Sequence, residues 1–304
     1  MRVGLVLGAG GMPAANFHAG ALTALELDLG WDARTADVIV GTSAGALTGM
    51  MLRWGAAASD LAAFLSELPE HNRHRASRHL RPLSVPRPTW TDFVPRPRID
   101  TWRNHHWRPR SALLSMLGHG RVDFRPHLSF VDADSNGAWP EGDLRICSVR
   151  REDMSRTVWS SDDGIHLTDA VASSCSVPGY ATDVEIKGSM YIDGGLHSPT
   201  NADVLVGREL DLVIVLSAMT PERVGRRFYM SPVSRWAEHR LTGEVKALQE
   251  HGSEVFVLRS PPRLARTATH PITALHGRQP RELTESFLSV ALRTPELGAL
   301  LSQG

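Results

Sequence analysis

Short apolar runs rich in β-branched residues recur along the chain, and each has the length of a strand. Several runs are near-continuous rather than alternating, which is typical of strands covered on both faces. Segments with helical periodicity lie between them, and this alternation predicts a three-layer α/β/α fold with a mostly parallel central sheet. The expected strands are 2–7, 37–40, 144–149, 156–159, 184–192, 212–216 and 254–258.

The helical segments are recognised by apolar positions three or four residues apart. Two of them follow a hydroxyl residue that can cap a helix, so Ser59 and Thr168 are the expected N-caps of 60–68 and 169–174. The remaining expected helices are 14–25, 46–54, 234–250 and 283–292.

The stretch 71–127 departs from this pattern. It holds twelve arginines against three acidic residues, together with seven prolines and three tryptophans. The prolines exclude a long helix, so we expect one domain over 1–304 that carries 71–127 as a basic insertion and ends, over 218–304, in helices and the last strand. The insertion fits a solvated surface segment. It also fits a lid that contacts anionic lipid head groups through its tryptophans and arginines. A third interpretation is a surface that binds a nucleic acid or another protein.

Net charge, cysteine content and the length of the apolar runs limit the class of protein. The 304 residues carry a formal net charge of zero, which gives no indication of a nucleic-acid partner. Cys147 and Cys175 both lie in apolar contexts, so we expect no disulfide and a reducing compartment. No apolar run approaches the roughly 20 residues of a spanning helix, and residues 1–15 fit a strand and loop better than a signal peptide. We therefore expect a cytoplasmic protein, with 71–127 as a candidate for peripheral membrane contact. The oligomeric state is left open.

The stretch "VIVGTSAGAL", residues 38–47, contains an abrupt strand-to-helix junction with Ser43 at the corner. Gly41 and Gly45 lack a Cβ, so the strand and the helix can pack closely around the bend. The serine hydroxyl then projects at the end of a strand beside the N–H groups of a helix N-terminus. This pattern predicts a nucleophile elbow; the alternative is a tight turn with a capping serine.

A hydroxyl nucleophile needs a base, and "MYIDGGLHSPTN", residues 190–201, offers one. Asp193 ends a predicted strand and is followed by Gly194 and Gly195. Functional side chains of α/β folds gather at strand ends, which makes Asp193 the candidate base. The alternative is an ordinary Asp-Gly turn.

A third feature is "VLGAGGMPAANFHAGAL", residues 6–22, which predicts a strand, a glycine-rich loop and a helix. The amides of Gly10, Gly11 and Met12 would point out of such a loop. They fit either an oxyanion hole or a cradle for a dinucleotide pyrophosphate. The second interpretation is weakened by Pro13, which stands where a Rossmann motif needs Gly or Ala for close packing.

These three motifs, in this order, resemble the patatin-like phospholipase family. "GAGGMP" resembles its glycine-rich oxyanion loop, "GTSAG" its elbow and "DGG" the motif of its catalytic acid. "ASSCSVPGY" (172–180) and "YIDGGLHSPTNADV" (191–204) also match. The resemblance covers roughly 3–217 apart from 71–127.

The resemblance implies an enzyme that hydrolyses carboxylic esters, typically the acyl chains of lipids, without a cofactor. Ser43 would be the nucleophile and Asp193 its only side-chain partner. The amides of Gly10, Gly11 and Met12 would bind the oxyanion. The motif glycines would be Gly8, Gly41, Gly45, Gly194 and Gly195.

One departure from the family concerns the head group. The family loop commonly carries Arg or Lys followed by Gly after its glycines, whereas this chain has Met12 and Pro13. Acyl hydrolysis is unaffected by this change, but a preference for phospholipids over neutral acylglycerols or other esters is left open.

Two alternatives remain at this stage. The first is a Ser-His-Asp hydrolase, in which a downstream histidine would join Ser43 and Asp193. The second is a non-catalytic lipid-binding protein on the same scaffold. A metal site is not predicted, because the densest histidine groups lie among arginines that would repel a cation. The candidate histidines of a triad are His197, His239, His251, His270 and His276.

Overall fold

The computed structural model describes residues 1–65, 120–128, 136–222, 230–268, 297–298 and 301. Most of the predicted insertion 71–127 lies outside these residues, as do the expected helix 283–292 and two histidines, His270 and His276. The predictions made for them therefore stay predictions.

A single sheet forms the centre of the described structure. Each strand is hydrogen-bonded to the next in the series β5-β6-β3-β2-β1-β7-β8, and β4 also pairs with β3. Neighbouring strands among β1, β2, β3, β7 and β8 pair in parallel, and the antiparallel pairs lie around β3 and β6. The mostly parallel sheet is the one predicted from the apolar runs. The strands are β1 (Val3–Leu7), β2 (Val38–Thr42), β3 (Asp143–Arg150), β4 (Arg156–Trp159), β5 (Val184–Ile186), β6 (Ser189–Asp193), β7 (Leu212–Pro221) and β8 (Glu254–Ser260).

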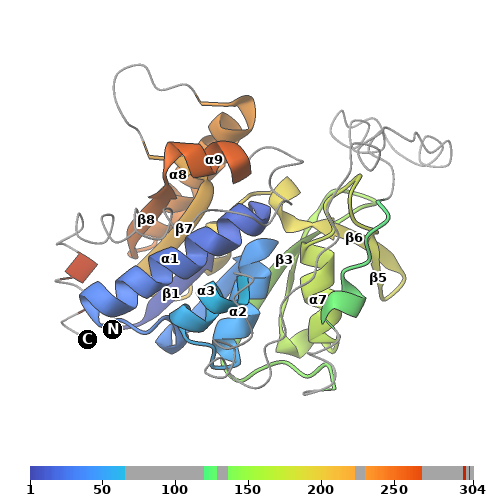
Figure 1. Cartoon of the computed structure of the whole chain (residues 1–304), viewed down its shortest axis with the longest axis horizontal. Helices are drawn as coiled ribbons and strands as arrows, with labels where there is room; N and C mark the ends of the chain where they lie inside the picture. The colour runs from blue at the N-terminus through green and yellow to red at the C-terminus, as the bar shows by residue number, and fades with distance from the viewer. Residues whose placement is uncertain (66–119, 129–135, 223–229, 269–296, 299–300, 302–304) are drawn as a thin grey trace.

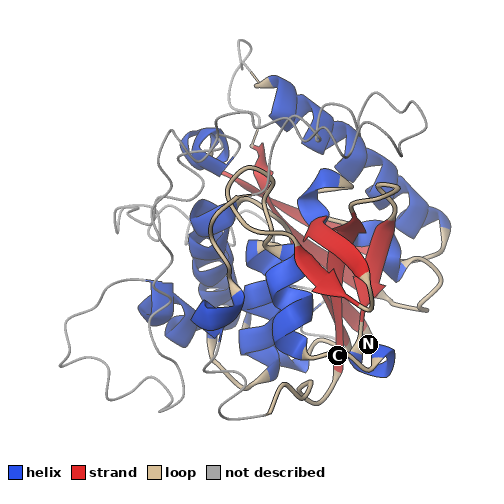
Figure 2. Ribbon diagram, turned by 90° about the vertical axis from the view of Figure 1, so that its right-hand side faces the viewer, coloured by secondary structure: helices blue, strands red, loops and turns tan. Residues whose placement is uncertain are grey.

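Helices cover both faces of this sheet, which makes the three layers (Figures 1 and 2). Alternate residues of a strand point to opposite faces. Leu5 and Leu7 of β1 accordingly join a core with α1, α2, α3, α7 and α9, whereas Val6 joins a second core with α8. The α-helices are α1 (Gly11–Leu29), α2 (Ala44–Arg53), α3 (Ala58–Leu65), α7 (Leu167–Ser174), α8 (Pro232–Glu250) and α9 (Pro262–Ala268). The short 3₁₀ helices are Ala33–Thr35, Arg125–Leu128, Ser161–Asp163, η6 (Gly194–Leu196) and η7 (Ala202–Leu205). Within the described residues, none of the helices has the length and apolar character needed to cross a bilayer.

The predicted strand 184–192 is wrong as one element, because it forms two strands. β5 and β6 pair as an antiparallel hairpin, and the chain reverses between them at Lys187 and Gly188. Both residues have positive φ, 50° and 77°, as two-residue hairpin turns with the right twist require. The sequence did not predict this reversal, because a lysine seldom adopts a positive φ.

Both predicted N-caps are also wrong. α3 begins at Ala58, before Ser59, because the Asp60 carboxylate accepts a hydrogen bond from the Ala57 amide at 3.1 Å and so satisfies the start of an earlier turn. α7 begins at Leu167, whose amide donates to the carbonyl of Gly137 at 3.0 Å. A long-range contact thus replaces the side-chain cap that was expected from Thr168. The helix α9 was not predicted.

The pairing around β3 positions the candidate site. β2 and β4 both pair with Ile146 and Cys147, so they lie on opposite edges of β3. β4 and β6 both pair with Ser148 and Val149, so β6 lies on the same edge as β2. Because β2 runs parallel to β3 and β6 antiparallel, the carboxyl ends of β2 and β6 face each other on that edge.

Candidate active site

Ser43 occupies the bend between the end of β2 and the start of α2. Its backbone has φ 56° and ψ −118°, and its side chain is 6% exposed. A positive φ at a residue with a Cβ is strained by about 1–3 kcal/mol, so the surrounding structure must hold it. Two glycines allow the bend. A Cβ on Gly45 would lie 1.9 Å from the carbonyl oxygen of Leu7, and one on Gly41 would lie 2.6 Å from the Cα of Ala46.

Ser174, at the end of α7, supports the same bend through two buried hydrogen bonds. Its Oγ accepts from the amide of Ser43 at 2.8 Å and donates to the carbonyl of Cys147 at 2.6 Å. The strained residue is therefore tied to β3 by a side chain 131 positions away. Because the amide of Ser43 already donates to Ser174, it is not free to bind a substrate oxygen.

Asp193, the last residue of β6, is 5% exposed and reaches Ser43. The Ser43 hydroxyl lies near enough to the Asp193 carboxylate to lower its pKa by hydrogen bonding, and the amide of Gly195 donates to its Oδ1 at 2.7 Å. Burial raises the pKa of Asp193 to about 6, and these two hydrogen bonds only partly oppose that effect. A carboxylate with such a pKa accepts a proton more readily than an exposed one.

The turn after Asp193 packs against β3 so closely that a side chain would not fit. A Cβ on Gly194 would lie 2.1 Å from the carbonyl oxygen of Cys147. The amide of Asp193 itself donates to the carbonyl of Ser176 at 3.0 Å. The position of the carboxylate is thus fixed from both sides by backbone contacts.

The glycine-rich loop follows β1, the neighbour of β2. Leu7 pairs with Gly41, so the loop after β1 lies beside the elbow after β2. A Cβ on Gly195 would lie 3.1 Å from the Cβ of Ala9, which brings the same loop up to the acid. The three predicted motifs therefore meet where the carboxyl ends of β1, β2 and β6 come together.

The amides of this loop fall into two groups. Those of Gly8 and Ala9 donate to the carbonyls of Leu216 and Pro199, at 3.0 and 2.7 Å. Those of the next residues, Gly10, Gly11 and Met12, donate to no backbone carbonyl in the described part of the chain. They begin the 19-residue helix α1, where unpaired N–H groups and the helix dipole favour a negative charge. Gly10 and Gly11 have φ 141° and 62°, which favours glycine at both positions.

Three of the histidines proposed for a triad, His197, His239 and His251, lie in the described residues, and none of them stands between Ser43 and Asp193. His197 Nε2 lies 2.9 Å from Nη2 of Arg240, and because arginine only donates, this nitrogen accepts. His239 is exposed on α8, and Nδ1 of His251 lies 2.8 Å from the carbonyl oxygen of Ala247. A triad would place a histidine between the hydroxyl and the carboxylate, whereas here the hydroxyl itself lies beside the carboxylate.

Two polar residues at this site were missed by sequence reasoning, Ser174 and Asn201. Both lie in stretches that resemble the family, "ASSCSVPGY" and "YIDGGLHSPTNADV", but nothing local to either residue predicts its partners. Asn201 is fully buried and contacts both the elbow and the turn after the acid.

Residues 5–206 match the family described as patatin-like phospholipase. Among solved structures, VipD from Legionella pneumophila is 12% identical and has a TM-score of 0.40, over 95% of this chain and 67% of that one. The type III effector protein ExoU is 16% identical with a TM-score of 0.32; the match takes in 99% of this chain and 62%, less than two thirds, of ExoU. A search of curated proteins finds no match.

The family match includes the glycine-rich loop, the elbow with Ser43 and the turn with Asp193, and it extends over more than half of the chain. The chain therefore belongs to the patatin-like phospholipase family.

Proposed function

We propose that this protein hydrolyses acyl ester bonds of lipids, with Ser43 as nucleophile, Asp193 as its base and the amides of Gly10, Gly11 and Met12 as oxyanion donors. Membership of the family supports lipid acyl hydrolysis in general. The observation that carries the finer assignment is the meeting of the two chain segments on one edge of β3, which places the Ser43 hydroxyl beside the buried Asp193 carboxylate.

In the first step the Ser43 oxygen attacks the ester carbonyl carbon while its proton passes to Asp193. An aspartate with an ordinary pKa of about 3.9 would be a weak base for a hydroxyl. The raised pKa of Asp193, about 6, improves the match, and the proton can move as the C–O bond forms.

The negative charge that appears on the carbonyl oxygen needs donors that are already in place. The amide of Ser43 is held by Ser174, whereas those of Gly10, Gly11 and Met12 lie at the start of α1. Each well-placed donor contributes on the order of 3 kcal/mol to stabilising the transition state. The loop amides would therefore supply much of the rate.

Collapse of the tetrahedral intermediate breaks the ester C–O bond. The leaving alcohol takes the proton from Asp193, and the acyl group stays on Ser43. Water then attacks this acyl-enzyme, Asp193 accepts the proton of that water, and the second collapse releases the carboxylic acid and returns the proton to Ser43. Both half-reactions use the same two side chains and the same donors.

The substrate head group is the least constrained part of the proposal. Met12 and Pro13 leave the start of α1 without the cation common in the family loop, which favours neutral acylglycerols or simple esters over phospholipids. The cytoplasmic location and membrane contact through 71–127 stay predictions, because most of that segment lies outside the described residues. A panel of phospholipids, acylglycerols and p-nitrophenyl esters would rank the substrates.

The decisive experiment compares purified wild type, Ser43→Ala and His197→Ala with p-nitrophenyl butyrate and a fluorophosphonate probe. We expect wild type and His197→Ala to turn over the ester and to be labelled at Ser43. Ser43→Ala should lose at least about 1,000-fold in turnover and should not be labelled. Retained turnover in folded Ser43→Ala would refute the nucleophile. Loss of turnover in folded His197→Ala would instead support a triad. A wild type that is neither active nor labelled by the probe would support a non-catalytic binding protein.

A further inference from the structure

The segment 194–201, which we call the acid loop, contacts every part of the proposed site. It begins directly after Asp193, and Gly195 donates to that carboxylate at 2.7 Å. Its Pro199 carbonyl accepts from the amide of Ala9 in the glycine-rich loop at 2.7 Å. Its last residue, Asn201, reaches the elbow. The acid loop is thus placed to set the relative positions of the acid, the oxyanion loop and the nucleophile.

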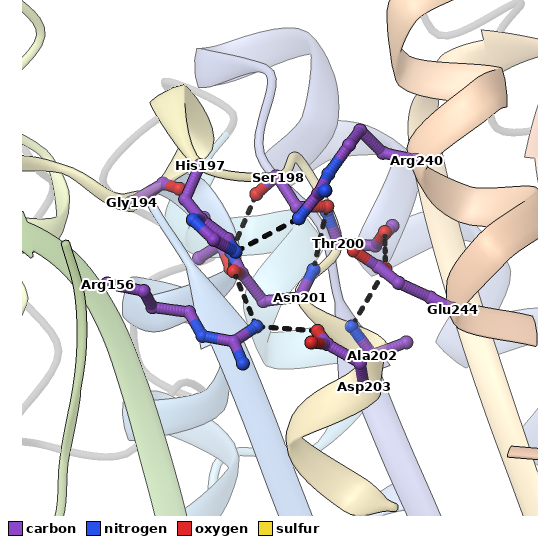
Figure 3. Close-up of polar contacts among 11 residues, drawn as sticks. Arg156, Gly194, His197, Ser198, Thr200, Asn201, Ala202, Asp203, Arg240 and Glu244 are labelled. Atoms are coloured by element: carbon purple, nitrogen blue, oxygen red, sulfur yellow. Dashed lines mark hydrogen bonds and ion pairs between the residues drawn. The ribbon is translucent and has the colours of Figure 1, made fainter. Parts of the chain in front are cut away.

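The side-chain amide of Asn201 makes the connection to the elbow. Its Nδ2 lies 3.1 Å from Oγ1 of Thr42, 3.4 Å from the carbonyl oxygen of Gly194 and 2.6 Å from that of Ser198. Thr42 directly precedes the nucleophile Ser43, and Gly194 directly follows the acid. One buried NH₂ group therefore joins the two chain segments that carry the proposed dyad (Figure 3 shows Asn201 among its polar neighbours).

The orientation of this amide group is fixed by a cation. Arg156, on β4, points its Nη1 at Oδ1 of Asn201 (3.3 Å) and at Oδ1 of Asp203 (2.5 Å), as Figure 3 shows. An arginine only donates, so the oxygen of the amide must face it and the nitrogen must face the three oxygens on the other side. The ion pair with Asp203 keeps the arginine in place.

The backbone on either side of Asn201 is anchored to α8. Oε2 of Glu244 accepts from Oγ1 of Thr200 at 2.5 Å and from the amide of Ala202 at 2.9 Å. Between these anchors Asn201 adopts the left-handed conformation, with φ 52°, which asparagine tolerates better than most residues. The side chain is therefore presented by a rigid backbone.

We propose that Asn201 is a positioning residue that sets the separation between Ser43 and Asp193. This inference rests on the proposed dyad. Thr42 Oγ1 and the Gly194 carbonyl are both hydrogen-bond acceptors toward Asn201, so only a donor placed between them can hold the two segments together. The Asn201 NH₂ group is that donor. Its loss leaves the side chains of the dyad intact while removing the cross-link behind them.

The test replaces Asn201 by aspartate, which has nearly the same size and also tolerates positive φ. The new carboxylate cannot bind the carbonyl oxygens of Gly194 and Ser198, and toward the Thr42 hydroxyl it can only accept. The matched control is Asn136→Asp, because Asn136 has the same φ of 52° but is exposed. The readouts are kcat and KM for p-nitrophenyl butyrate, the pH profile, fluorophosphonate labelling and the thermal midpoint.

We expect Asn201→Asp to lower kcat by about 100-fold, as a misplacement of roughly 1 Å can do, with less than about a twofold change in KM. The acid limb of its pH profile should move upward, because a wider separation weakens the hydrogen bonding by Ser43 that lowers the pKa of Asp193. Asn136→Asp should behave as wild type.

A second pair of variants, Thr42→Val and Thr42→Ser, tests the same contact from the other side and covers the case in which Asn201→Asp does not fold. Thr42→Val removes the acceptor and should lower kcat, and Thr42→Ser restores it and should recover most of the rate. A kcat within about twofold of wild type in both Asn201→Asp and Thr42→Val, while Ser43→Ala is inactive, would overturn the positioning role alone. Active Ser43→Ala would instead overturn the dyad on which it rests.

Discussion

Thr42 and Asp193 pair with consecutive residues of strand β3, Cys147 and Ser148. The first belongs to a strand that runs parallel to β3 and the second to one that runs antiparallel, so the two carboxyl ends meet on one edge. The residue after Thr42 is Ser43, whose hydroxyl lies beside the Asp193 carboxylate. Sheet pairing thus assembles the proposed dyad, and the side chains of Ser174 and Asn201 hold it.

The first prediction concerns the pH dependence of turnover. Asp193 must be ionised to accept the proton of Ser43, and its pKa is raised to about 6 by burial. We expect kcat/KM for a neutral ester to rise with pH through an acid limb near 6 and then level off. Initial rates measured from about pH 4 to pH 8 in buffers of constant ionic strength check this. A limb near the ordinary aspartate pKa of about 3.9 would contradict the burial of the base.

The second prediction concerns the stability of Asp193→Asn. The folded state holds the Asp193 pKa at about 6, above the unfolded value of about 3.8, so folding favours the protonated form. The stability from this group is present below the unfolded pKa and is lost as pH rises through 6. At pH 8 the wild type is therefore weakened by up to about 3 kcal/mol, whereas asparagine carries no charge.

Asp193→Asn should accordingly raise the free energy of unfolding near pH 8 and have little effect near pH 4, while it nearly abolishes turnover. Urea unfolding of both proteins at the two pH values measures the difference. An equal change at both values would mean that charge burial is not the cause.

The third prediction concerns the close packing behind the site. A Cβ at Gly45 or Gly194 would lie 1.9 or 2.1 Å from a carbonyl oxygen of β1 or β3. Because backbone cannot move aside cheaply, Gly45→Ala and Gly194→Ala should each destabilise the fold by about 3 kcal/mol or more. The control is Gly243→Ala on the exposed side of α8, where no atom lies within 4 Å of the new Cβ. It should gain up to about 1 kcal/mol from helix propensity, and chemical denaturation compares all three. Wild-type stability in either of the first two variants would refute the packing argument.

The fourth prediction concerns Ser174, which binds the amide of the strained Ser43. Ser174→Ala removes the acceptor of this buried amide and one donor to the Cys147 carbonyl, which costs about 1–3 kcal/mol of stability. It should also lower kcat about tenfold, since the elbow loses a restraint. Ser176→Ala is the matched control, because the Ser176 hydroxyl is also buried but donates to the carbonyl of Ala172, one turn back in the same stretch. Equal losses of kcat in the two variants would show that Ser174 has no special role at the elbow.

Much of the framework was predictable from local pattern. Apolar runs identified the strands because a strand buried on both faces must be apolar along its length. Ser43 and Asp193 stood out because each follows or ends such a run and is flanked by glycines that permit a close turn. The reversal at Lys187 was not predictable, since an unfavourable backbone conformation there is enforced by the pairing of β5 with β6.

The sequence by itself determined the elements, the elbow, the strand-end carboxylate and the glycine-rich loop, because each is a property of a few neighbouring residues. Only the tertiary structure decided that β6 follows β2 along one edge of β3, and that Ser174 and Asn201 reach partners 131 and 159 positions away. It also decided the raised pKa of Asp193, because burial of a carboxylate depends on every segment that covers it.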